Sequence, residues 1–160
     1  MNIHFKIVMA TAVLLVAESS FAAELQLNNI CNPWLDTFYK LPLKERISTF
    51  KSYDLENQYI IFICGNQVVH PPAIYLAEPF AKQGSAIVPF LKVKLAQAND
   101  DLTIRDIVLV FAEMGRQHSY NVSKDVDLVK VITGKVGGMH DPDWKAAAQG
   151  NVNKILEASK

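Results

Sequence analysis

The residues best suited to chemistry in this chain are histidines and the acids beside them. His118 lies in a polar loop, residues 115–123, and His140 comes directly before Asp141, with Asp143 two residues further on. Imidazole and carboxylate groups bind zinc and other transition metals, and they also serve as general acids and bases. If folding brought these residues together, they would form a metal-dependent hydrolytic site. We therefore take His118, His140, Asp141 and Asp143 as the candidate cluster for metal binding or catalysis.

The spacing of these residues argues against that chemistry. Zinc ligands on one helix often stand four positions apart, and no two histidines of the chain do so. Asp141-Pro142 is typical of a helix N-cap followed by the first helical position. Gly134, Gly137 and Gly138 follow a predicted helix rather than a strand, which argues against a phosphate-binding loop. We therefore expect no catalytic residue, no metal and no cofactor.

The two cysteines, Cys31 and Cys64, are the second feature with chemical consequences. An even count in an exported chain favours a disulfide. Redox chemistry is the alternative, but the sequence has no Cys-x-x-Cys motif, and Cys64 follows an apolar run in which thiols are inert. The sequence therefore predicts a structural disulfide between Cys31 and Cys64, formed in an oxidising compartment.

Residues 1–22 are typical of a signal peptide. Lys6 provides a basic end, Ile7–Ala17 is an apolar run of suitable length, and Ser20–Ala22 offers small residues for cleavage. The run is too short for a membrane helix, which needs roughly 20 apolar residues. A buried N-terminal helix is the alternative. We expect a periplasmic or secreted protein, with 23–160 as a single helical domain that has no membrane span after cleavage.

Composition narrows the class of partner. Lys and Arg number 16, Asp and Glu also number 16, and half of the residues are apolar. This mixture is that of an ordinary globular domain, with enough apolar surface to offset chain entropy. Because there is no basic excess, the composition gives no indication of nucleic-acid binding.

Apolar residues recur every three or four positions and predict an all-α fold of six to eight short helices in antiparallel pairs. The segment Leu102–Gln117 is apolar around more than half of its circumference, so we expect it at the centre. The segment Leu55–Gln67 could instead form a buried strand, although helical segments flank it. Caps, prolines and glycines bound the other expected helices: 32–39, 43–51, 73–82, 86–98, 125–136 and 142–156.

One helical pair resembles a HEAT-type repeat. Ser85–Leu91 carries a proline among apolar residues, and Leu95, Asp101, Arg105 and Val108 follow as in that family. The match covers about 35 residues, and successive helical pairs recur at about 40 residues. The flanking pairs are looser, because the first lacks the proline and the last contains glycines within its helices. The resemblance implies an α-solenoid-like domain, a fold whose members mostly bind other proteins, and it implies no catalytic residues.

We therefore expect an exported module that binds another protein, through a helical face or the loops Gly65–Pro72 and Gly115–Ser123. Trp34 and Trp144 belong to a residue type enriched in binding hot spots, although core packing would also explain them. One alternative is an immunity-type inhibitor of a secreted toxin enzyme. Another is a small metal-dependent hydrolase that uses the candidate cluster. A third is a carrier whose cavity for an apolar ligand is lined by Phe62, Phe90 and Phe111.

Overall fold

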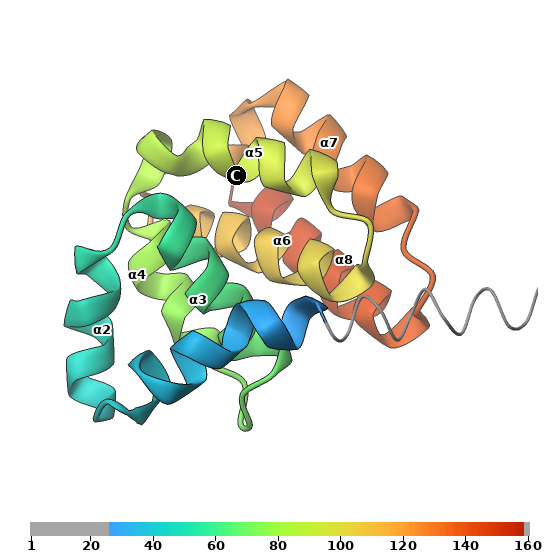
Figure 1. Cartoon of the computed structure of the whole chain (residues 1–160). Coiled ribbons are helices and arrows are strands. Elements are labelled where there is room, and N and C mark those ends of the chain that lie inside the picture. The colour runs from blue at the N-terminus through green and yellow to red at the C-terminus, as the bar shows by residue number, and fades with distance from the viewer. Residues whose placement is uncertain (1–25, 159–160) are drawn as a thin grey trace, which may run out of the picture.

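The computed structural model describes residues 26–158, which form an all-α domain (Figure 1). This part of the chain contains eight α-helices and no strand, as predicted. The predicted signal peptide, residues 1–22, lies outside the described residues. The first described helix covers residues 26–36, and the others are α2 (Leu43–Ser52), α3 (Leu55–Gln67), α4 (Ala77–Ala81), α5 (Val88–Gln97), α6 (Asp101–Arg116), α7 (Val126–Gly137) and α8 (Pro142–Glu157).

Helix α6 lies at the centre of the domain, as its apolar circumference predicts. Ile107, Val108 and Phe111 on α6 are completely buried. Helix α6 packs most extensively against α8 and also against α4, whereas α5 packs against α7 (Figure 1). The HEAT-like stacking of helical pairs into a solenoid stays a prediction. Within residues 26–158, no helix combines the length and apolar character required to cross a bilayer.

Aspartates act as N-caps for four of these helices. The side chain of Asp54 accepts a hydrogen bond from the backbone N–H of Asn57, and Asp100 accepts one from Thr103. Asp125 and Asp141 do the same at the starts of α7 and α8. Each cap satisfies backbone donors that the first turn of a helix leaves without a partner. The position of the helix starts therefore follows from local sequence.

The segment Leu55–Gln67, for which the sequence also allowed a buried strand, is helical, so the strand alternative is wrong. Its apolar residues from Ile61 to Cys64 are all buried, because this helix has neighbours on several sides. Burial all around a helix removes the polar face that would have distinguished it from a buried strand in the sequence.

Three predicted helix boundaries are wrong. Asn32-Pro33 does not open the first helix, because residues 26–36 are already helical and Cys31 is held within them by its disulfide to α3. Residues 73–82 divide into a 3-10 turn (Ile74–Leu76) and α4, with Pro79 in the first turn of α4. Ser85 makes no cap and lies in a 3-10 turn before α5, which begins late enough for Pro89 to fall in its first turn. Proline costs little there, because no helical partner is required for its nitrogen.

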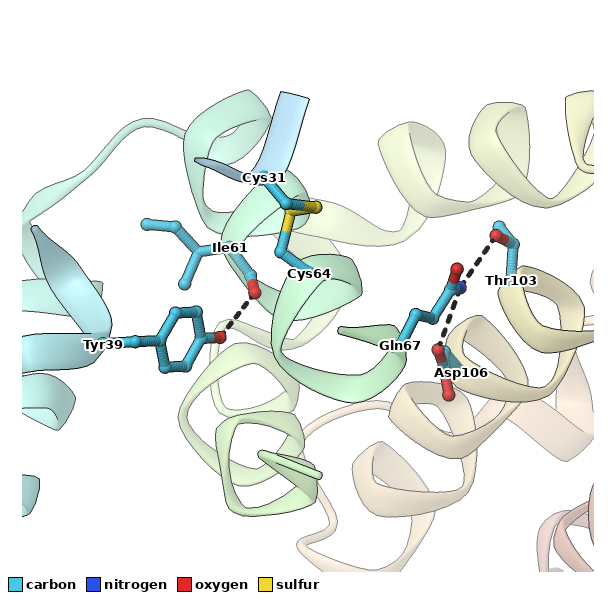
Figure 2. The surroundings of a disulfide bond; sticks show 7 residues. All are labelled: Cys31, Tyr39, Ile61, Cys64, Gln67, Thr103 and Asp106. Carbon is cyan, nitrogen blue, oxygen red and sulfur yellow. Dashed lines mark hydrogen bonds between the residues drawn. A yellow bond between two sulfur atoms is a disulfide. The ribbon is translucent and has the colours of Figure 1, made fainter. Parts of the chain in front are cut away.

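Long-range contacts attach the first helix, and the 3-10 turn that follows it (Phe38–Lys40), to α3 (Figure 2). Cys31 and Cys64 form the predicted disulfide, with a sequence separation of 33. The hydroxyl of Tyr39 donates a hydrogen bond to the carbonyl oxygen of Ile61 at 2.6 Å, and burial raises the pKa of Tyr39 well above its ordinary value. Gly65 makes room for this ring, since a Cβ there would lie 2.0 Å from the Tyr39 hydroxyl oxygen. The disulfide and the tyrosine together fix one side of α3.

Candidate functional site

The fold separates the residues of the predicted metal cluster. His118 follows the C-terminal end of α6, whereas His140 and Asp141 lie against its N-terminal end, where their backbone N–H groups donate to Asp101 Oδ2 at 2.9 and 2.7 Å. A helix of this length spans about 24 Å at 1.5 Å per residue. The two histidines therefore cannot share one metal ion. Among residues 26–158, no group of three or more His, Cys, Asp or Glu side chains is placed to hold a metal.

His118 instead ends helix α6. Its φ of 55° places it in the left-handed region, which non-glycine residues adopt infrequently. The N–H of Ser119 donates to the carbonyl of Met114 at 3.1 Å, and the N–H of His118 donates to that of Gly115 at 3.1 Å. These two bonds form a Schellman motif, in which the left-handed position is usually glycine. The backbone of His118 is therefore explained by helix termination.

Asp141 and Asp143 belong to the start of α8. One carboxylate oxygen of Asp141 accepts hydrogen bonds from the N–H groups of Asp143 and Trp144 at 2.9 and 3.0 Å. Asp143 lies exposed in the first turn, where a negative charge is favoured by the helix dipole. The alternative use of Asp141 as a cap, predicted from Asp141-Pro142, is the one that the structure supports.

A different set of residues does come together, centred on Asp106. This aspartate is only 1% exposed, and its Oδ1 accepts hydrogen bonds from both Nε and Nη2 of Arg105, at 2.9 and 2.6 Å. Its Oδ2 accepts a longer bond of 3.3 Å from Gln67 on α3, which also donates to Thr103 Oγ1 at 3.1 Å (Figure 2). The aspartate therefore joins α3 to α6, on the side of α3 opposite the Tyr39 contact (Figure 2).

The same arginine continues this chain of contacts to the surface. The guanidinium carbon of Arg105 lies 4.4 Å from the centre of the Trp144 ring, a distance typical of a cation–π contact. Trp144 is 39% exposed, whereas the Arg105 side chain is only 16% exposed. The N-cap at Asp141 fixes the backbone of Trp144. An exposed indole is thus held from beneath by an arginine that a buried carboxylate orients.

The electrostatics of Asp106 are unusual for a carboxylate that has an arginine partner. Burial raises the pKa of Asp106 to about 6, and the negative charge of Asp100 acts in the same direction. The charge and hydrogen bonds of Arg105, together with the amide of Gln67, lower the pKa but do not outweigh burial. Asp106 is therefore ionised at neutral pH and becomes protonated in mildly acidic solution.

Sequence reasoning missed Asp106. A signal was present, because an aspartate stands in the middle of the most apolar helix, and buried carboxylates require partners. Arg105 entered only as part of the HEAT resemblance, and Trp144 only by its residue type. What no local pattern contained was that residues 105 and 144 meet across 38 intervening positions.

The other predicted binding elements are used differently. The predicted loop Gly65–Pro72 begins too early, because residues 65–67 belong to α3. Asn66 there is buried, and its side-chain amide has no hydrogen-bond partner among the described residues. The loop Gly115–Ser123 lines a surface pocket of about 190 Å³ with His118, Tyr120 and Asn121. Of the three rings expected to line an apolar carrier site, Phe62 packs on Phe80 and Phe90 packs on Tyr59. A carrier cavity among them stays a prediction.

A larger groove of about 350 Å³ runs between α6 and α8. Leu109 and Ala112 contribute apolar atoms, and Glu113 and Arg116 are paired with each other along it. Arg116 holds the pKa of Glu113 below its usual range. Lys154 and Glu157 add one charge of each sign to the lining, so the four charged side chains of the groove sum to zero.

The Arg105–Trp144 surface, defined as Trp144 with Arg105 and Asp106 beneath it, is thus the most strongly organised exposed feature that we identify. Its parts come from α6 and α8, with support from α3. Comparison with protein-family models, with curated proteins and with solved structures finds no match to this chain.

Proposed function

We propose that this chain is an exported protein-interaction module that binds its partner through the Arg105–Trp144 surface. The disulfide between Cys31 and Cys64 is consistent with an oxidising compartment such as the periplasm. The predicted signal peptide supports the same location. Balanced charge gives no indication of nucleic-acid binding, which leaves another protein as the expected kind of partner.

The observation that carries the proposal is the preorganised indole. Tryptophan and arginine are the residue types enriched in binding hot spots, where they lie on rigid, well-packed support. Trp144 is exposed enough to contact a partner. Its ring also packs against the guanidinium of Arg105, which the buried Asp106 holds in place. Preorganisation lowers the conformational entropy lost on association and so favours affinity.

A more specific form of the proposal is an inhibitor of an exported enzyme. No contact in the structure favours that form over another protein partner. The hydrolase alternative receives no support, because His118 and His140 lie at opposite ends of α6. Identification of the captured partner would therefore distinguish an inhibitor from other binding modules.

The test is capture of a partner with the mature chain, residues 23–160, from an envelope extract of the source cells. We expect one stoichiometric partner, and we expect Trp144→Ala to weaken its binding about 30-fold, because hot-spot residues contribute about 2 kcal/mol or more. Val126→Ala is the matched control, since Val126 is 77% exposed on α7. Repeated capture without a stoichiometric partner would overturn the proposed function, and equal affinity of the two variants would remove Trp144 from the binding surface.

A further inference from the structure

We propose that Asp106 is a proton-operated latch: when ionised it fixes Arg105 against Trp144, and when protonated it releases the guanidinium and loosens the Arg105–Trp144 surface. The biological use of this latch rests on the proposed function, because it would make partner binding weaker in acidic surroundings. The latch itself is a property of the free protein. It can therefore be tested without a partner.

The geometry of the ion pair provides the mechanism. Both N–H groups that Arg105 directs at Asp106 end on the same oxygen, Oδ1. Protonation of the carboxyl removes the Coulomb attraction of this ion pair, so a neutral Asp106 holds the guanidinium by hydrogen bonding alone and less firmly. The Arg105 side chain is 16% exposed, so its guanidinium can turn toward water. The carboxyl group of Asp106 cannot turn toward water in this way, because it is only 1% exposed.

The charged groups around Asp106 place its titration in the mildly acidic range. From its own helix, Arg105 favours the ionised form, while Asp100 in the preceding turn opposes it. From α3, Gln67 donates a hydrogen bond to the carboxylate, and Tyr59 has its pKa raised to about 12, so it stays neutral. The balance brings the pKa of Asp106 to about 6.

More distant charged groups lie on the neighbouring helices. Lys135 on α7 and Lys145 on α8 donate to backbone carbonyls. Glu56 on α3 is paired with Lys94 on α5, whose ammonium lies 4.9 Å from the centre of the Tyr59 ring. From α8, the neighbouring group is the uncharged indole of Trp144, which contacts Arg105. Asp101 accepts two backbone hydrogen bonds from residues 140 and 141. Asp106 is consequently the carboxyl whose protonation removes a charge from beneath the indole.

The experiment follows Trp144 alone, in a Trp34→Phe background, from pH 4.5 to 7.5. Emission and quenching by acrylamide report the environment and accessibility of the indole. We expect a single transition with a midpoint near the Asp106 pKa of about 6, with Trp144 more accessible on the acidic side. Asp106→Asn, whose side chain is neutral at every pH, should show the acidic signature throughout.

Two variants control for neighbouring groups. Asp100→Asn should keep the transition but move it to lower pH, because the Asp100 charge raises the pKa of Asp106. His140→Gln should leave the transition in place, because the backbone of His140, rather than its ring, bonds to Asp101. Far-ultraviolet dichroism at both ends of the pH range confirms that each variant stays helical.

A transition that survives in Asp106→Asn, or its absence in the parent, would overturn the latch. If Asp106→Asn fails to fold, the carboxyl carbon of Asp106 is titrated by NMR in the otherwise natural chain. A midpoint different from that of the Trp144 transition would then overturn the latch, and a shared midpoint would support it. Because these measurements need no partner, failure of partner capture and failure of the latch are separate results.

Discussion

The two halves of this domain are stabilised in different ways. From residue 26 through α4, the core is aromatic: Phe50 packs edge-on against Phe80 at 5.7 Å, and Phe62 packs against the same ring at 5.9 Å. A disulfide and the Tyr39 hydroxyl then join segments that lie 33 and 22 positions apart. This N-terminal half is therefore held by contacts between distant parts of the sequence.

The C-terminal half, from α5 through α8, depends on aliphatic burial and local caps. Leu128, Ile132 and Val136 recur along α7, and all three are buried. Asp100 and Asp125 begin α6 and α7 with short-range side-chain bonds. The comparison teaches that local signals place helices accurately where they are strong, whereas cross-links override them. Two of the three wrong boundaries, at the first helix and at residues 73–82, lie in the cross-linked half. The third is the start of α5, which has no side-chain cap.

The largest expected effect comes from removing the disulfide. Replacement of both Cys31 and Cys64 by alanine should lower the free energy of unfolding by about 3–4 kcal/mol, because the cross-link restricts a long loop in the unfolded chain. Urea titration should be followed separately through Trp34 in the N-terminal half and Trp144 in the C-terminal half. We expect the Trp34 signal to change first. Coincident curves would show that the two halves do not differ in local stability.

The next largest effect is a pH dependence of the free energy of unfolding. It arises from Asp106, which links α6 in the C-terminal half to α3 in the N-terminal half. The folded pKa of Asp106, about 6, exceeds its ordinary value of 3.8, so the group contributes stability below pH 4 that is lost as pH rises toward 6. The loss amounts to about 3 kcal/mol at 1.36 kcal/mol per unit. The measurement is the unfolding free energy of the parent minus that of Asp106→Asn. A difference independent of pH between 4 and 7 would contradict it.

A smaller loss is expected where the halves meet at Gly84. This glycine has a φ of 60°, and an added Cβ would lie 2.5 Å from the Ser119 carbonyl oxygen, so Gly84→Ala should destabilise by about 2 kcal/mol. The hydroxyl of Ser119 also donates to the carbonyl of Ala81, which leaves this junction little freedom to shift.

Gly150→Ala is the matched control for Gly84→Ala. It lies within α8 with no atom near its added Cβ, so it should stabilise by about 0.5–1 kcal/mol. Thermal unfolding of both variants and of the parent measures these two changes in stability. Equal effects would mean that the junction is more plastic than its geometry indicates.

The smallest effect belongs to a local cap in the C-terminal half. Asp141→Ala removes the acceptor for two N–H groups at the start of α8 and should cost about 1 kcal/mol. Asp141→Asn retains an acceptor and should recover most of this loss, as measured by chemical denaturation. A cost as large as that of the disulfide would show that the C-terminal half is not governed by local signals.

Much of the fold followed from sequence because its determinants are short-range. A cap at Asp125 depends on a residue three positions away, and the apolar period of α6 depends on one turn. The even number of cysteines in a chain expected to be exported was enough to predict that they form a disulfide. The resemblance to helical repeats indicated paired helices but supplied no site. These features required no knowledge of how the helices pack.

The candidate site could not be predicted in the same way. Arg105 and Trp144 meet only because α6 packs against α8, and Asp106 contacts Gln67 only because α3 lies beside α6. The same packing places His118 and His140 at opposite ends of α6, so residues that suited one metal site in the sequence are far apart. Periodicity and capping free energies act within a few residues, and they therefore determined which segments are helical. The partners of each side chain were decided by burial between helices, which depends on the whole tertiary structure.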